Sequence, residues 1–176
     1  MKNKSIKIRP ATIKDFALIE AVHQAAFAKS DFGYNGEGLL ARQLHEAGDA
    51  LVSLIAEADG VPVGHVMFSR MRVEADGQSV IAAALAPTGV VPEWQGKGVG
   101  GQLIKAGLAA LKPQGVQLGF VVGHTDYYPR FGYSAELARP YDSPYAGPYF
   151  MAVQLDSGLK APKVGKAEFA PAFASF

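Results

Sequence analysis

The sequence predicts an α/β protein in which strands and helices alternate along one compact chain. Its 176 residues are 49% hydrophobic and 19% charged, which is typical of one globular domain with a substantial core. Several apolar runs have the length and turn signals of strands, and a glycine-rich loop separates one such run from a helical pattern. We therefore expect residues 1–176 to form a single domain, with a core at about 6–155 and a C-terminal extension at 156–176.

The N-terminal part is expected to form one strand and two helices. Residues 6–9 favour a strand, and residues 13–27 favour a helix that Thr12 caps, with Asp15 at the capping-box position. Residues 31–38 have the composition of a loop. A second helix is predicted over residues 39–47, where Gly48 ends it.

Two Asp-Gly pairs predict hairpins in the next third of the chain. Residues 51–58 and 63–70 are strand-like on either side of Asp59-Gly60, and a further hairpin is expected to turn at Asp76-Gly77. The uncharged run 80–92 then favours a strand that is buried on both faces.

Proline and glycine interrupt that last strand. Pro87 and Pro92 cannot donate to a ladder, and Gly89 weakens a strand interior, so we expect a bulge or a departure from a neighbouring strand. Unpaired peptide groups at Val90 and Val91 would then be free to bind an amide-containing ligand in a strand-like manner. A poorly formed edge strand would give the same pattern.

The loop at residues 94–103 has the chemistry of a phosphate site. Glycines at 96, 98 and 101 let the backbone approach an anion, and free amides at a helix start attract it. A dinucleotide fingerprint fits less well, because residues 92–95 separate the loop from the strand and no carboxylate follows about twenty residues later. A Walker lysine followed by Ser or Thr is also absent. A turn that only caps a helix remains open, as does, more distantly, a nicotinamide-dependent oxidoreductase.

Helix and strand patterns continue after the loop. Apolar residues at helical spacing predict a helix over 100–112, which Pro113 ends. Further strands are expected over 116–122, 150–155 and, near the C-terminus, 166–169, whereas residues 135–148 are most simply an irregular loop.

A second motif is a tyrosine that stands four residues before a Gly-aromatic pair, as in Tyr128, Gly132 and Tyr133. Together with the glycine loop, it resembles the GCN5-related N-acetyltransferase (GNAT) superfamily, and the chain is similar to the bacterial predicted N-acetyltransferases within it. The family pattern of Arg or Gln, two spacers, Gly, a spacer and Gly or Ala matches residues 95–100. The resemblance implies the GNAT fold: a mixed, mostly antiparallel central sheet with splayed strands, flanked by helices.

The resemblance also implies acetyl-CoA as the co-substrate and a set of residues that bind it. Val90 and Val91 are carried over as partners of the pantetheine arm. The pyrophosphate is expected on the backbone amides of the loop and helix start, at Gln95, Gly96, Lys97, Gly98, Val99, Gly100, Gly101 and Gln102. Because Gln95 stands where the family often has arginine, part of a charge-assisted contact is lost. Lys97 either compensates for this loss or is merely solvated.

The implied reaction is acetyl transfer to a primary amine. Tyr128 matches the family's general acid, since a phenol with a pKa of about 10 is protonated at neutral pH and can supply the departing sulfur. Tyr128 as a core aromatic is an equal alternative, and the sequence does not settle whether Tyr127 or Tyr128 faces the sulfur. Because the chain has no cysteine, we favour direct attack by the amine in a ternary complex over a covalent intermediate.

The sequence does not single out a general base. Candidates are Glu37, Glu57, His65, Glu74, and His124 with Asp126, although each is also explained as a surface charge or an interior histidine. No acidic residue occurs between residues 80 and 91, where the family has a glutamate, so a chain of water molecules is an alternative. The histidines lack the spacing of metal ligands, and we expect no metal.

Partners and location are predicted more broadly. The loops at 31–38 and 141–149 flank the family's acceptor channel, and Asp31, Glu37 and Asp142 would attract a cationic amine unless they are ordinary loop charges. A small molecule or a protein is equally acceptable as the amine. A net charge of +1 without basic stripes argues against nucleic acid and membrane surfaces.

No apolar run reaches the length of a membrane span, and residues 1–4 do not open a signal peptide, so a cytoplasmic protein is expected. The apolar residues 169–176 either pack on a second copy, which makes a homodimer possible, or close the same sheet. A non-catalytic acyl-CoA binding or sensing module is the main alternative function, since it needs the glycine loop but not Tyr128.

Overall fold

The computed structural model describes residues 5–176, and the interpretation of residues 1–4 lies outside this range. Within it, eight strands form one sheet with the main order β1-β2-β3-β4-β5-β7, while β8 joins β3 and β6 joins β8. The strands are β1 (Ile6–Pro10), β2 (Ala50–Ala58), β3 (Val61–Ala75), β4 (Gln78–Val90), β5 (Leu118–Val122), β6 (Tyr141–Asp142), β7 (Phe150–Gln154) and β8 (Gly165–Glu168). The α-helices are α1 (Phe16–Phe27), α2 (Glu37–Glu46), α3 (Val99–Leu111) and α4 (Ala135–Ala138).

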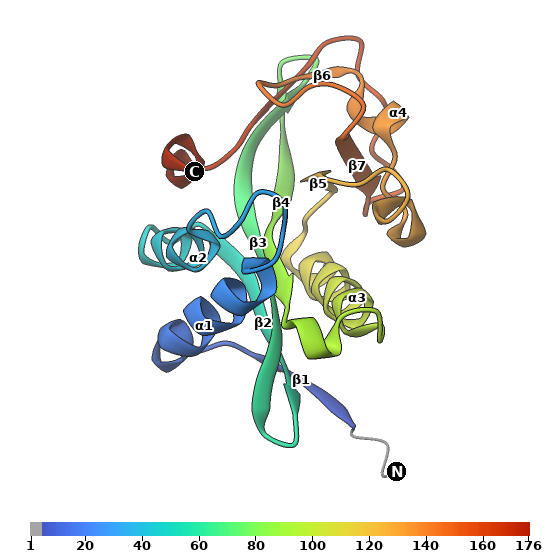
Figure 1. The fold of residues 1–176 in the computed structure, drawn as a ribbon. Coiled ribbons are helices and arrows are strands. Elements are labelled where there is room, and N and C mark those ends of the chain that lie inside the picture. The colour runs from blue at the N-terminus through green and yellow to red at the C-terminus, as the bar shows by residue number, and fades with distance from the viewer. Residues whose placement is uncertain (1–4) are drawn as a thin grey trace.

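The sheet is mostly antiparallel and is covered by helices on both faces. Helices α1 and α2 lie together on one face of the long strands, and α3 lies on the other (Figure 1). Strands β4 and β5 run parallel, but they pair only between Ala82–Ala84 and Leu118–Phe120. Beyond Ala84 the two strands diverge, which leaves one edge of β4 free of β5 up to Val90. These features confirm the predicted α/β class with a mixed, splayed sheet between helices.

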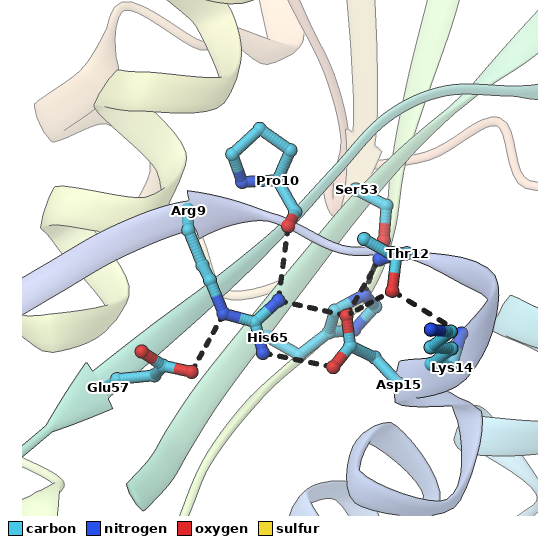
Figure 2. A network of polar contacts seen from close by, with 8 residues as sticks. All are labelled: Arg9, Pro10, Thr12, Lys14, Asp15, Ser53, Glu57 and His65. Carbon is cyan, nitrogen blue, oxygen red and sulfur yellow. Dashed lines mark hydrogen bonds and ion pairs between the residues drawn. The ribbon is translucent and has the colours of Figure 1, made fainter. Parts of the chain in front are cut away.

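The predicted N-terminal strand and helix cap are confirmed, but α2 begins at Glu37, inside the predicted loop 31–38. Thr12 and Asp15 form a capping box that begins a single 3-10 turn at Ile13–Asp15, and this turn leads directly into α1. The Asp15 carboxylate also accepts two hydrogen bonds from the Arg9 guanidinium at 2.8 and 2.9 Å (Figure 2). Arg9 Nε donates to Glu57 on β2, so the network ties the start of α1 to two strands.

Both Asp-Gly pairs form the predicted hairpin turns. At Asp59-Gly60 the φ angles are 51° and 78°, and at Asp76-Gly77 they are 50° and 79°. Two consecutive left-handed residues suit the twist of a two-residue hairpin. The register between β3 and β4 shifts between Val66 and Phe68, which confirms the expected irregularity opposite the proline- and glycine-containing part of β4.

The prediction of an irregular loop over residues 135–148 is wrong in part. The Ser134 hydroxyl accepts from the Glu136 amide and caps the short helix α4, because a serine N-cap satisfies a free amide at a helix start. Tyr141 is buried, and its ring lies 5.3 Å from that of Phe120. Strand β6 forms because β8 returns from the end of the chain to pair with it.

The C-terminal segment packs on the chain's own helices. Residues Pro171–Ser175 form a 3-10 turn, and Phe173 is buried in a cluster with Ile19 of α1 and Leu40 of α2. Figure 1 shows the C-terminus beside α2. Among the helices in residues 5–176, none has the length and apolar character that a membrane crossing requires.

Candidate functional site

A cavity of about 490 Å³ opens where β4 ends and α3 begins. Its wall combines the glycine loop, the first two turns of α3 and the aromatic cluster that follows β5. The lining residues are Val90, Trp94, Gln95, Gly96, Gly98, Val99, Gly100, Gly101, Gln102, Lys105, Tyr127, Arg130 and Phe131. The structure therefore brings together most of the residues predicted to bind the co-substrate. Val91 and Lys97 do not line this cavity.

The backbone at the start of α3 is arranged to bind an anion. Gly96 and Gly98 have φ angles of 71° and 82°, which glycine adopts without steric cost. Within the described chain, the first hydrogen bond of the helix runs from the Gln102 amide to the Gly98 carbonyl at 3.0 Å. The amides of residues 99–101 are therefore left to a ligand or solvent, at the positive end of the helix dipole.

The peptide groups of Val90 and Val91 are less free than predicted. The Val91 amide donates to the Val63 carbonyl of β3 at 2.9 Å, so strand pairing continues one residue further than expected. The Val90 carbonyl accepts from the Gln95 side chain at 2.8 Å. The expectation of unpaired groups at both positions is therefore wrong, because β3 and Gln95 engage them. Gln95 fixes the loop to the strand.

Cationic side chains supplement the backbone amides, and two of them were not predicted. Lys105 lies on α3, four residues after Gly101, and Arg130 lies in the aromatic cluster; both line the cavity. Residues four apart share a helix face, so the position of Lys105 could have been inferred from the sequence. The Arg130 guanidinium lies 5.5 Å from the centre of the Tyr127 ring. The Lys97 ammonium lies 5.2 Å from the Trp94 ring, so it stacks rather than pointing into the cavity.

The two adjacent tyrosines have different environments. Tyr127 lines the cavity, and a Cβ added at Gly100 would stand 2.9 Å from its hydroxyl oxygen. Tyr128 is only 8% exposed and packs against Tyr133 and against Gly123, directly after β5. Burial, with a smaller contribution from Tyr127, raises the pKa of Tyr128 to about 12. Its hydroxyl is therefore protonated at neutral pH, and none of residues 5–176 forms a hydrogen bond with it.

The predicted base candidates are scattered, and none lines the cavity. Glu57 is paired with Arg9, while Glu37 is buried and accepts from the Asn35 amide at 2.9 Å. Glu74, His124 and Asp126 are exposed. His65 differs from these residues, because it is fully buried and in contact with a second histidine.

The partner of His65 is His23 of α1, a residue that the sequence did not single out. The two rings approach to 2.8 Å between His23 Nε2 and His65 Nδ1. His65 Nε2 lies 2.9 Å from the Ser53 hydroxyl. Residues 5–176 contain no group of three or more His, Cys, Asp or Glu side chains placed to hold a metal ion.

A glycine-lined helix start that opens beside splayed strands is the site expected of the acyl-CoA-dependent transferases that the sequence resembles, and comparison with known proteins agrees with this class. The acetyltransferase (GNAT) domain model matches residues 7–135. The chain is 40% identical over 120 residues to the uncharacterized N-acetyltransferase YjhQ of Escherichia coli K12, an alignment that spans 66% of each protein. It is 31% identical over 125 residues to YhbS of the same strain, across 70% of this chain and 72% of the relative.

Solved structures extend the similarity over nearly the whole chain. A GNAT family acetyltransferase from Brucella melitensis in complex with acetyl-CoA superimposes with a TM-score of 0.79 at 31% identity, covering 97% of this chain and 99% of the other. YhbS from Escherichia coli in complex with CoA gives a TM-score of 0.81 at 25% identity, covering 99% and 94%. The chain belongs to the GNAT acetyltransferase family, which confirms the resemblance and the acyltransferase class at the level of the family.

Proposed function

We propose that this chain transfers the acetyl group of acetyl-CoA to a primary amine by direct attack in a ternary complex. The observation that carries the proposal is the cavity at the start of α3, where free backbone amides meet two cationic side chains. A diphosphate satisfies both kinds of donor at once. The acetyl-CoA and CoA complexes of the two similar structures support the same ligand.

In this proposal the nucleotide end of acetyl-CoA lies over α3. The amides of residues 99–101 hold the diphosphate, and Lys105 and Arg130 add charge. The pantetheine arm then follows the free edge of β4 at Val90, where β5 has diverged. The thioester is thereby directed toward the splay between the two strands, where Gly123 and Tyr128 follow β5.

The chemistry requires two proton movements. The neutral amine nitrogen attacks the thioester carbonyl, the carbon–sulfur bond breaks, one proton leaves the nitrogen, and one proton reaches the sulfur. We assign the second proton to the Tyr128 hydroxyl, since its raised pKa keeps it protonated until the thiolate forms. Tyr127, which faces Gly100 in the cavity, is assigned to binding rather than to proton donation.

Two observations favour the alternative of a non-catalytic acyl-CoA binding or sensing module. Tyr128 is largely buried and does not line the cavity, and β4 carries no acidic residue between Gln78 and Val90. A sensor needs the cavity to bind its ligand, but it needs neither a general acid in the cavity nor an acidic residue on β4. The two functions therefore differ in turnover, not in ligand binding.

A panel of primary amines with acetyl-CoA, read out by release of free thiol, tests the proposed reaction. Acetyl-CoA is expected to raise the melting temperature, whereas NADH is not. Binding without thiol release for any amine favours the sensor. A melting shift with NADH alone would contradict the co-substrate assignment.

The role of Tyr128 is tested with a matched pair of variants. Tyr128→Phe is expected to lower kcat about 100-fold or more, because general acid catalysis contributes factors of this size, while the shift with acetyl-CoA persists. Tyr127→Phe serves as the control and should change the KM for acetyl-CoA more than kcat. Unchanged kcat in Tyr128→Phe across the pH range would remove Tyr128 from the mechanism.

A further inference from the structure

Three side chains from three elements form a continuous buried hydrogen-bonded chain on the α1 face of the sheet. His23 of α1 contacts His65 of β3 at 2.8 Å, and His65 contacts Ser53 of β2 at 2.9 Å. Both imidazole rings are fully buried. Figure 2 shows His65 and Ser53 beside the Arg9–Asp15 network at the start of α1. The reaction proposed above uses none of these contacts.

The inner end of this chain is a nitrogen atom without a partner. His23 Nδ1 is buried and has no hydrogen bond with any of residues 5–176. Its neighbours are small: a Cβ added at Gly89 would stand 2.9 Å from Nδ1 and 3.1 Å from the Cβ of Ala26. A buried polar nitrogen left unpaired is costly, so its position requires an explanation.

The position of this nitrogen points to the reacting end of the site. Gly89 directly precedes Val90, along which the proposed pantetheine arm lies, and this part of β4 has no β5 neighbour. His23 Nδ1 therefore lies against β4 on the α1 face, one residue before Val90 of the cavity wall.

The outer end of the chain reaches the surface. Ser53 is half-buried and, with Pro10, His45 and Gln114 among others, lines a separate surface depression of about 340 Å³. A proton that arrives at the Ser53 hydroxyl can thus pass to solvent in this depression.

Burial, more than any nearby charge, keeps the two rings neutral. Burial lowers the pKa of His23 to about 4, and burial together with His23 lowers the pKa of His65. Asp15 acts in the opposite direction on His65, but its carboxylate is already paired with Arg9, which also holds Glu57. Strand β4 carries no titratable side chain between Gln78 and Val90.

We propose that His23, His65 and Ser53 form a proton relay that removes the proton of the acceptor amine; this rests on the proposed function. The amine or an intervening water gives a proton to His23 Nδ1 as the nitrogen–carbon bond forms. His23 Nε2 passes its proton to His65 Nδ1, and His65 Nε2 passes its own to Ser53 and onward to solvent. Each ring gains one proton and loses one, so neither histidine remains charged; both hydrogens then lie on Nδ1 and must return to Nε2 before the next turnover.

The relay requires one particular tautomer of each histidine. His23 Nδ1 can accept a proton only if the neutral ring carries its hydrogen on Nε2. That hydrogen then points to His65 Nδ1, and His65 must carry its own hydrogen on Nε2, facing Ser53. Both contacts are satisfied by this single arrangement.

The tautomers are measured directly by nitrogen NMR of the histidine rings in the full-length protein. Bare Nδ1 and protonated Nε2 on both rings at neutral pH are expected. A neutral His23 ring with its hydrogen on Nδ1 would overturn the relay, since that atom could not accept a proton. This measurement needs neither acetyl-CoA nor an identified acceptor.

Kinetics test whether the chain moves protons. His23→Asn and His65→Gln keep polar groups but cannot relay a proton, and each is expected to lower kcat about 100-fold at pH 7 with little change in the KM for acetyl-CoA. The deficit should shrink as pH rises toward about 10, because hydroxide from solvent can then take the proton that the relay would otherwise remove. Ser53→Ala is expected to act in the same direction, and Glu46→Gln, on the exposed surface of α2, is the control.

The outcomes separate the relay from the proposed function. A wild-type protein that transfers acetyl to no amine overturns both. Wild-type turnover with variants that keep the wild-type kcat overturns the relay alone. A loss that is equal at all pH values, or that appears in KM with a lowered melting temperature, assigns the histidines a structural role and also overturns it.

Discussion

At the scale of single residues, the cavity combines two ways of holding an anion. Backbone amides at the start of α3 supply a fixed geometry, and Lys105 and Arg130 supply full positive charge from two different elements. Gln95 stands where the family often has arginine, and its side-chain amide donates to the Val90 carbonyl instead. The charge that this position lacks is therefore provided by residues outside the glycine motif.

Removing either charge should weaken CoA binding. Lys105→Ala and Arg130→Ala are each expected to raise the Kd for CoA about tenfold, because a charge-assisted contact to phosphate contributes about 1.5 kcal/mol or more. The effect should diminish at high salt. Isothermal titration with CoA measures it, and Lys112→Ala, at the far end of the helix, is the control. Equal affinities for all variants would indicate that the backbone amides alone bind the diphosphate.

The residue scale also shows what the sequence can and cannot predict. The glycine loop was recognisable because positive φ and a free helix start are local properties of Gly96 and Gly98. The engagement of the Val91 amide was not, since its partner Val63 is supplied by another strand. His23 gave no signal for a similar reason: its contact with His65 joins residues 42 positions apart.

At the scale of elements, α3 packs closely on β3 through a glycine. A Cβ added at Gly107 would lie 2.2 Å from the Phe68 ring, whereas one at Gly101 would meet only the Phe131 ring at 3.5 Å. Phe68 is fully buried and belongs to the main core. Helix α3 can therefore approach the sheet closely because Gly107 has no side chain.

The same substitution at these two glycines should therefore have opposite effects. Gly107→Ala is expected to destabilise the protein by about 1–3 kcal/mol, because the methyl group overpacks the core. Gly101→Ala should be neutral or about 0.5 kcal/mol stabilising, since alanine favours helix. Urea unfolding of the two variants without ligand measures both. Stabilisation by Gly107→Ala would contradict the close packing of α3 on Phe68.

The sequence predicted correctly those elements whose geometry is set by residues close together in the chain. Both Asp-Gly hairpins and the Thr12 capping box were predicted, because their geometry is set within a few residues. Strand β3 is longer than the predicted 63–70, since β4 and β8 extend it to Ala75. Strand β6 was missed because its two residues depend entirely on β8.

At the scale of the whole molecule, the buried histidine pair links stability to pH. The pKa of His23 falls from 6.5 to about 4 on folding, so between these values the unfolded chain binds a proton that the native chain does not. Stability is therefore complete above about pH 6.5 and falls as the pH is lowered toward 4. His65 acts in the same direction. Asp15, whose pKa Arg9 lowers, contributes only below this window.

Acidification from pH 7 to 4.5 should accordingly reduce the free energy of unfolding by about 2.5 kcal/mol for His23 alone, at about 1.4 kcal/mol per pKa unit. Urea unfolding at pH 7, 5.5 and 4.5 measures this loss. His23→Asn is expected to start from a lower stability but to change less with pH. A variant that parallels the wild type at every pH would show that His23 is not titrating on unfolding.

Strand β8 closes a gap in the sheet that β2 leaves. Pairing of β2 with β3 ends at Ser69, and β8 covers β3 from Arg72 to Ala75. A chain shortened before residue 165 would present bare amide and carbonyl groups along this stretch, a template for association between molecules. We expect such a truncated protein to aggregate on expression. Affinity tags fused after residue 176 should require a spacer, so that Phe173 keeps its buried contact.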